Sequence, residues 1–303
     1  MKRAAAVFRQ ELAHTLSRPL FLFLIALLLL LSFGLSRGNV TIASGDSTVG
    51  GTKAWITSEF AFAFVLSTLA GVLYAFFLAI ASGLAIVEDD EWKVSELLHA
   101  TPLTPREYAW GKFLAVACGF GIALGMHLLF AMVWNQLVPN PHTAEIRGPF
   151  ALANYLRPAL VFAAPALVFY AGVAFYLGER TRRPLLVFLF PLAMFLLSIF
   201  FLWEWSPSWL DPRLNRALML VDPSGFRWLN ETWLRLDRGA RFYNTSRIVL
   251  DAGFLVSRAV FLGLGLAGVR LAERGLARRV GGGAGRAAGA AGATGAGPAV
   301  APH

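Results

Sequence analysis

The segment EDDEWKVSELLHATPLTPREYAWGK, residues 88–112, interrupts the most apolar part of this chain. It carries six acidic residues and lies between two apolar runs, Phe60–Val87 and Ala109–Trp134. Runs of this length can cross a bilayer as helices, so the charged segment between them has to lie at a membrane surface. The sequence therefore predicts an all-α integral membrane protein.

The charged segment also contains signals for the start and the end of helices. Asp89 and Asp90 can cap a short helix, which Pro102 would end. The apolar side of this helix would be formed by Trp92, Leu97 and Leu98. Thr104-Pro105-Arg106-Glu107 is a capping box with proline at the first helical position, which predicts that the next helix begins there. A short capped helix between two spans suits docking onto another protein.

Six apolar runs in total are long enough to span a membrane. They cover residues 19–36, 60–87, 109–135, 158–178, 184–203 and 248–270. The composition agrees, because 57% of the residues are hydrophobic and only 15% are charged. The sequence thus predicts six transmembrane helices.

Basic residues flank these runs unevenly. They gather in the N-terminal segment, in the connection 179–183 and after residue 270. Because cytoplasmic flanks are enriched in Lys and Arg, both termini, residues 88–108 and residues 179–183 are predicted to face the cytoplasm, in the inner or plasma membrane of a cell. The segment 204–247 opposes this bias, since it carries seven arginines on the predicted outer side.

The predicted organisation has seven parts. An interfacial amphipathic helix (1–18) has Ala4, Phe8, Leu12 and Leu16 as its apolar face, with Glu11 elsewhere around the axis. The remaining parts are spans one and two (19–87), the cytoplasmic segment (88–108), spans three to five (109–203), an extracytoplasmic tryptophan-rich segment (204–247), span six (248–270), and a basic flank with a disordered Gly/Ala tail (271–303).

The tryptophan-rich segment contains a further helix signal. Asp222-Pro223 predicts a helix start, after which apolar residues repeat at intervals of three and four. These residues are Phe226, Leu229, Trp233 and Leu236. The pattern predicts an amphipathic helix at the outer leaflet. Anchoring is the favoured role, and an outer gate or a lid is the alternative.

Two charged residues lie within the predicted sixth span. Asp251 and Arg258 are seven residues apart, hence on one helix face, and each is expected to meet a partner on another span or water. A structural contact is the favoured interpretation, and a translocation path or a subunit interface is the alternative. In the third span, His127 is expected to be a hydrogen-bonded interior residue and Cys118 a small buried hydrophobe.

Motifs of enzyme chemistry do not occur in the sequence. It has no GxxxxGK[ST] phosphate loop, no HExxH, no GxSxG and no CxxC, which predicts a chain without catalytic residues, metal or cofactor of its own. Its net charge of +9 comes largely from the flanks of spans, which favours contact with anionic lipid over nucleic acid.

The stretch ELLHATPLTPREYAWGK resembles the segment after the second span of ABC type-2 transporter permeases. The matching residues are Glu91, Glu96, Leu97, Leu98, Thr101, Pro102, Gly111 and Lys112. The sequence departs from the family at Lys93 and Val94, where many relatives have Gly-Thr. In the outer segment, Asp222-Pro223-Ser224-Gly225, Asn230-Glu231-Thr232 and Phe242-Tyr243-Asn244-Thr245 resemble a subgroup of which some members are fused to a zinc aminopeptidase domain.

The resemblance implies one half of an exporter-like transporter. Two permease subunits, identical or paralogous, would pair, and two separate ATPases that bind ATP and magnesium would dock on their cytoplasmic side. Segment 88–102 would be the coupling helix, with its contacts made by Glu91, Trp92, Glu96, Leu97, Leu98, Thr101 and Pro102. Two alternatives from the residues alone are an ion-coupled secondary carrier and a non-transporting membrane scaffold or regulator that docks an ATPase.

Overall fold

The computed structural model describes residues 2–38, 42–44, 47–91, 103–203, 207 and 209–294. Within them, six helical segments are long and apolar enough to cross a membrane: Pro19–Ser36, Glu59–Asp89, Pro105–Leu137, Leu152–Thr181, Pro184–Trp203 and Ala252–Arg279. Each overlaps one of the six predicted runs. The prediction of an all-α multi-pass membrane protein is confirmed.

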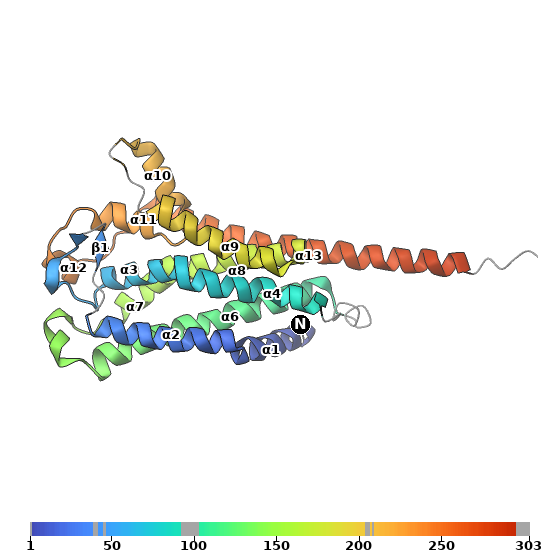
Figure 1. Ribbon diagram of the computed structural model, residues 1–303, viewed down its shortest axis with the longest axis horizontal. Helices are drawn as coiled ribbons and strands as arrows, with labels where there is room; N and C mark the ends of the chain where they lie inside the picture. The colour runs from blue at the N-terminus through green and yellow to red at the C-terminus, as the bar shows by residue number, and fades with distance from the viewer. Residues whose placement is uncertain are drawn as a thin grey trace, which may run out of the picture.

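The elements follow one another along a bundle (Figure 1). The helices are α1 (Lys2–Ser17), α2 (Pro19–Ser36), α3 (Glu59–Leu69), α4 (Ala75–Glu91), α6 (Pro105–Met132), α7 (Leu152–Pro158), α8 (Ala164–Thr181), α9 (Pro184–Leu197), α10 (Pro212–Val221), α11 (Phe226–Leu229), α12 (Ala240–Thr245) and α13 (Ala252–Thr294). Wider π-helical turns join or extend several of them, at Ala70–Tyr74, Val133–Leu137, Ala159–Ala163, Ser198–Trp203 and Asn230–Leu234. Two-residue strands, β1 (Ala43–Ser44) and β2 (Ser47–Thr48), and 3-10 turns at Gly51–Lys53 and Pro141–Ile146 lie in the connections.

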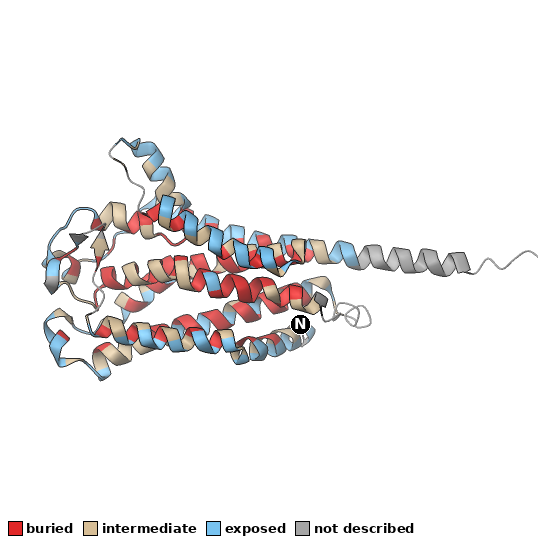
Figure 2. Ribbon diagram, viewed as in Figure 1, coloured by how far each residue is buried: buried red, intermediate tan, exposed pale blue. Residues whose placement is uncertain are grey.

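The core of the bundle runs along α2, α4, α6 and α8, where buried residues concentrate (Figure 2). Glycine allows α8 to approach its neighbours closely. A Cβ atom on Gly172 would lie 1.9 Å from the carbonyl oxygen of Gly265 on α13, and one on Gly178 would lie 2.3 Å from that of Gly83 on α4. Small residues at such contacts let helix backbones approach one another in a membrane.

The N-terminal helix α1 packs along α6 rather than standing apart from the bundle (Figure 1). Its predicted apolar face is only half-buried, whereas Glu11 and Thr15 are buried. The predicted apolar face is therefore not the most deeply buried side of α1. The reason is that α6 presents a cation to α1, as described below, so an acid is the complementary residue there.

The tryptophan-rich segment folds onto one end of the bundle instead of forming a single amphipathic helix. Trp228 and Leu229 are buried against Phe60, Phe162 and Phe254, whereas Leu236, predicted to lie on the apolar face, is 76% exposed. The predicted helix is present over residues 226–234, where α11 continues into the π-helical turn Asn230–Leu234, but it ends before Leu236 and packs Leu229 against the bundle. Among the described helices, α10 has no buried residues, and it projects from the bundle (Figure 1).

Two predicted boundaries at the C-terminal end differ from the structure. Span six begins at Ala252, so Asp251 precedes it. The same helix, α13, continues to Thr294, although residues 281–303 were predicted to be disordered. Alanine, which alternates with glycine there, has the highest helix propensity, and the preceding turns of the span provide the nucleus from which the helix continues. Residues 295–303 lie outside the described residues.

Candidate functional site

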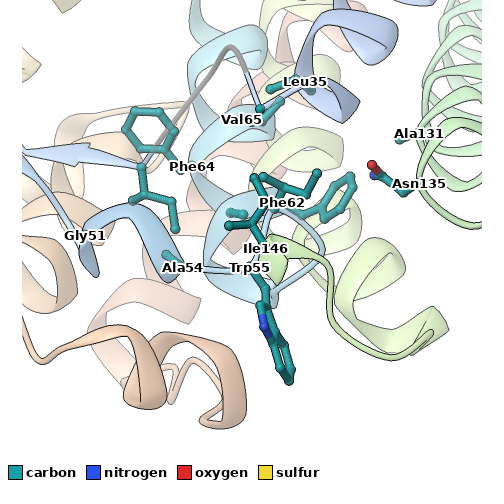
Figure 3. Close-up of a pocket in the computed structure, with 14 residues that line it drawn as sticks. Leu35, Gly51, Ala54, Trp55, Phe62, Phe64, Val65, Ala131, Asn135 and Ile146 are labelled. Carbon is teal, nitrogen blue, oxygen red and sulfur yellow. The ribbon is translucent and has the colours of Figure 1, made fainter. Parts of the chain in front are cut away.

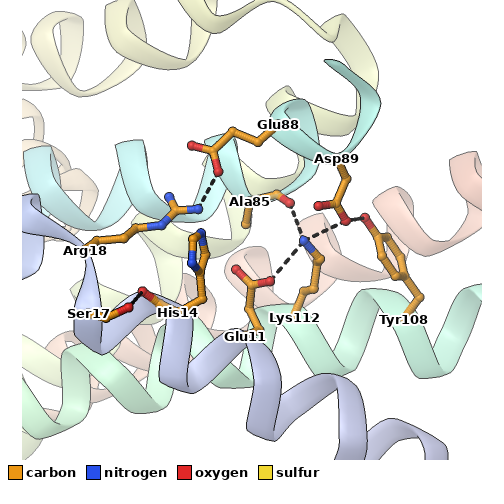
Figure 4. Close-up of polar contacts among 9 residues, drawn as sticks. All are labelled: Glu11, His14, Ser17, Arg18, Ala85, Glu88, Asp89, Tyr108 and Lys112. Carbon is orange, nitrogen blue, oxygen red and sulfur yellow. Dashed lines mark hydrogen bonds and ion pairs between the residues drawn. The ribbon is translucent and has the colours of Figure 1, made fainter. Parts of the chain in front are cut away.

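Two acidic side chains at the α1 end of the bundle converge on Lys112 of α6 (Figure 4). Its ammonium nitrogen Nζ lies 2.7 Å from Oδ2 of Asp89 on α4 and 3.0 Å from Oε2 of Glu11 on α1. It also donates a hydrogen bond of 2.6 Å to the carbonyl oxygen of Ala85. The hydroxyl of Tyr108 donates to Asp89 Oδ2 at 2.5 Å. One cation thus holds three helices together, and we call Glu11, Asp89, Tyr108 and Lys112 the lysine cluster.

Burial makes these contacts energetically important. Lys112 is only 7% exposed, and Glu11 is also buried. A buried ion that loses its partner leaves an uncompensated charge, which costs about 3–5 kcal/mol. A second ion pair, between Arg18 and Glu88 at 2.5 Å, links the α1–α2 junction to α4 beside the lysine cluster. The end of α4 is therefore connected to both α1 and α6.

Local sequence explains how α6 presents Lys112. The Thr104 hydroxyl accepts a hydrogen bond from the backbone N–H of Glu107, and the Glu107 carboxylate accepts from that of Thr104. This capping box, with Pro105 at the first helical position, begins α6 as predicted. Lys112 follows two turns into the helix. Gly111 lets α1 approach, because a Cβ there would lie 2.9 Å from Val7.

The structure assigns Asp89 a different contact from the one predicted. Asp89 lies inside α4, and its carboxylate binds Lys112 and Tyr108 instead of capping a new helix. The prediction of a cap at Asp89 is wrong because α4 continues through this residue to Glu91, and its carboxylate there meets the ammonium group of Lys112. The side chains of the predicted coupling residues, Glu91, Trp92, Glu96, Leu97, Leu98, Thr101 and Pro102, lie outside the described residues.

The opposite end of the bundle contains a tight turn, Asp222–Gly225, that Arg258 of α13 holds in place. The Arg258 guanidinium donates hydrogen bonds of 2.6 Å to the carbonyl oxygens of both Asp222 and Pro223. It also lies over the rings of Phe254 and Phe261. The partner of this charge is thus the backbone of a connection, not a side chain on another span.

The turn also corrects a predicted helix start. The Asp222 side chain accepts from the N–H groups of Ser224 and Arg227, and Gly225 has a left-handed backbone with φ of 76°. Asp222-Pro223 therefore forms a turn before α11, because a left-handed residue interrupts the helix. The Asp-Pro pair that does begin a helix is Asp211-Pro212, the start of α10.

A second arginine, Arg227, is buried completely beside this turn. It donates to Oδ1 of Asn215 and to the carbonyl oxygen of Leu202, each at 2.7 Å. Burial lowers the pKa of the Arg227 guanidinium, whose ordinary value is so high that the group stays charged. Asn215 in turn donates to the predicted motif residue Glu231. Sequence reasoning missed Arg227, although an arginine between apolar residues is a recognisable signal of a buried, paired charge.

Other residues of the predicted outer motif also make structural contacts. Asn244 accepts from the backbone N–H of Trp55 at 2.7 Å and donates to the carbonyl of Lys53, which ties α12 to the connection before α3. Thr245 bonds within its own helix, and Asn230 begins a π-helical turn. These contacts hold the segment on the bundle.

Asp251 is the residue that caps α13. Its carboxylate accepts from the backbone N–H of Phe254 at 2.8 Å and from the indole nitrogen of Trp228 at 2.7 Å. Asp251 and Arg258 thus have separate partners, as their spacing predicts, but Asp251 is exposed and lies before the helix. The expectation of a charge inside the span is wrong for Asp251 because the helix starts later than its apolar run.

A small apolar pocket lies near the same end, between α2, α3 and the end of the third span (Figure 3). It measures about 50 Å³, and Phe62, Val65, Trp55 and Ile146 are among the residues around it. Asn135 is the one amide side chain in this lining. The volume is sufficient for a few atoms only, so the pocket offers no site for a sizeable substrate.

Two further residues of the third span were singled out in the sequence. His127 is buried, and its Nδ1 lies 3.2 Å from the Tyr74 hydroxyl, which confirms the expected interior hydrogen bond. Cys118 is exposed on α6 and free, so the prediction of a buried cysteine is wrong. In a membrane-spanning helix, exposure of a small apolar side chain to lipid carries no desolvation cost.

Groups of three or more His, Cys, Asp or Glu side chains that could hold a metal ion do not occur among the described residues. A comparison with models of known protein families gives no match. A search of curated proteins likewise finds no relative of this chain.

Proposed function

We propose that this chain is the membrane-spanning permease subunit of an ATP-binding-cassette transporter of type-2 architecture. In this proposal, segment 88–102 docks on a separate cytoplasmic ATPase, and a second permease subunit completes the transporter. The observation that carries the proposal is that the lysine cluster joins the two helices between which the segment runs. Asp89 lies near the end of α4, and Lys112 lies near the beginning of α6.

This connection supports a mechanical role for the segment. A force applied to residues 92–102 reaches α4 at one side and α6 at the other, and both helices are joined to α1 through Glu11, Arg18 and their partners. Because charged contacts in a buried setting resist separation, the three helices would move as one body. ATP-driven closure of the ATPases could then shift spans two and three together.

Charge placement supports an ATP-driven permease over an ion-coupled carrier. A carrier needs ionisable groups near the membrane midplane that can change their protonation or ion contacts. Asp251, the candidate for that role, caps the end of a helix, and Arg258 is held by backbone carbonyls. The scaffold alternative shares the docking step and differs only in the absence of transport.

The test is co-purification of the full chain with its ATPase, identified by its Walker motif, and ATP hydrolysis by the complex in nanodiscs. We expect Glu96→Ala with Leu97→Ala to lower ATP hydrolysis and to weaken retention of the ATPase. A matched control replaces exposed residues at the opposite end, Glu145→Ala with Leu236→Ala, and should leave both unchanged. Stable ATPase binding by a variant with residues 89–99 scrambled would contradict the docking claim.

A further inference from the structure

An open pocket of about 460 Å³ lies between the ends of α8 and α13, on the α1 side of the bundle. Its volume is within the range of about 300–1,000 Å³ that small-molecule sites occupy. Four arginines line it, from both helices: Arg180, Arg274, Arg278 and Arg279. Arginine is the side chain best suited to bind phosphate, because its guanidinium donates two parallel hydrogen bonds.

The pocket keeps a surplus of positive charge. Among the described residues of the lining, the one acid is Glu179, which is only 1% exposed and pairs with Arg279 at 3.3 Å. Close packing fixes this carboxylate, since a Cβ on Gly275 would lie 2.4 Å from its Oε2 atom. After this pairing, Arg180, Arg274 and Arg278 remain in the lining, all of them exposed. The pocket therefore attracts an anion.

The depth of the pocket identifies the kind of anion. Arg180 stands next to the last residue of the fourth span, and the other arginines lie in the last turns of the apolar part of α13, Ala252–Arg279. Because basic residues at the ends of spans mark the membrane surface, we expect this level to be that of the lipid headgroups. Two other lining residues, Tyr176 and Leu271, lie about one turn deeper toward the membrane. Leu271 is exposed, so apolar surface continues from the arginines into the bilayer.

We propose that this pocket binds the headgroup of an anionic phospholipid, with the phosphate at Arg180, Arg274 and Arg278 and the start of the acyl chains along Tyr176 and Leu271. Basic pockets between transmembrane helices bind anionic headgroups in this way. The lipid would bridge spans four and six. The proposal requires only that the chain spans a membrane and is independent of the transport function proposed above.

The experiment is native mass spectrometry of the full chain in detergent micelles, titrated with phosphatidylglycerol or with phosphatidylcholine of identical acyl chains. We expect phosphatidylglycerol to bind wild-type protein more tightly. Because each arginine near a membrane surface strengthens binding severalfold, Arg274→Ala with Arg278→Ala should lower this affinity about tenfold or more. The matched control, Arg9→Ala with Arg106→Ala, removes two exposed arginines outside the pocket at the same end and should retain the wild-type affinity.

Three results would overturn the proposal. The first is equal affinity of the wild-type protein for the two lipids. The second is an equal loss of affinity for phosphatidylglycerol in the pocket variant and in the control variant. The third is displacement of phosphatidylglycerol by inorganic phosphate at equal concentration. The last result would identify a free-phosphate site, since inorganic phosphate makes no contact with Leu271 through an acyl chain. The comparison of the two lipids on wild-type protein does not depend on the folding of any variant.

Discussion

The ammonium group of Lys112 on α6 lies 2.7 Å from the carboxylate of Asp89 on α4, at the two sides of the charged segment that interrupts the apolar sequence. Glu11 on α1 provides a second carboxylate to the same ammonium group. The cluster therefore has one positive and two negative side chains, and Tyr108 donates a hydrogen bond to Asp89. Loss of the single cation leaves the buried Glu11 and the half-buried Asp89 near each other without a counter-ion.

Replacement of Lys112 by methionine should destabilise the protein strongly. The change leaves the carboxylates of Glu11 and Asp89 without their counter-ion, which costs about 3–5 kcal/mol in a buried setting. The free energy of unfolding can be measured in mixed micelles by titration with a denaturing detergent. Lys53→Met is the control, because Lys53 is exposed and should change stability by less than about 0.5 kcal/mol.

A second variant separates the charge effect from lost packing. Neutralising the two acids together with the lysine (Glu11→Gln, Asp89→Asn and Lys112→Met) removes the unpaired charges, so we expect part of the lost stability to return. A triple variant as unstable as Lys112→Met alone would show that the ion pairs are not the source of the stability.

The sequence predicts the spans well because length and apolarity alone decide them. All six helices lie on the apolar runs, and the Thr104–Glu107 capping box is a local signal that is read without tertiary information. The contacts of Lys112 could not be predicted in this way. Its partners lie on other helices, and only packing of α1 and α4 against α6 brings them together.

The two Asp-Pro pairs of the outer segment also show that a local helix signal does not decide the structure by itself. Both are valid helix-start signals. Asp211-Pro212 begins α10, whereas Asp222-Pro223 forms a buried turn, because Gly225 adopts a left-handed conformation and Arg258 binds the turn's carbonyl groups. The Asp-Pro pair is the same in both places, but the glycine that follows one of them and the distant Arg258 determine the outcome.

Arg258→Lys should destabilise the turn although it conserves the charge. A lysine ammonium group cannot reproduce the planar fork that reaches the carbonyl groups of Asp222 and Pro223 together, so we expect a loss of about 1–3 kcal/mol for the buried acceptor left unpaired. Thermal unfolding in micelles measures the change. Arg213→Lys, at an exposed position of α10, is the control. Equal stability of the two variants would contradict the structural role of Arg258.

Two glycines of α13 should respond oppositely to alanine. In Gly265→Ala, the new Cβ would lie 2.3 Å from the carbonyl oxygen of Val168, so α8 and α13 must separate at a cost of about 1–3 kcal/mol. No atom lies within 4 Å of a Cβ on Gly263, so Gly263→Ala should be neutral or stabilising by up to about 1 kcal/mol through helix propensity. Unfolding in micelles compares the pair. A similar loss of stability in both variants would show that Gly265 is not needed for the close approach of α8 and α13.

Replacement of Asp251 tests whether this residue acts as a cap or as an ion-coupling group. Asp251→Ala removes the cap of α13 and leaves the Trp228 indole N–H without its acceptor, so we expect a loss of about 1–3 kcal/mol. Asp251→Asn keeps one acceptor oxygen for the Phe254 N–H, but its amide nitrogen cannot accept from the Trp228 indole, so we expect a loss smaller than that of Asp251→Ala. Thermal unfolding of both variants, with the indole environment followed by near-ultraviolet circular dichroism, measures the difference. If asparagine proved as damaging as alanine, the cap on the Phe254 N–H would not be the source of the stability.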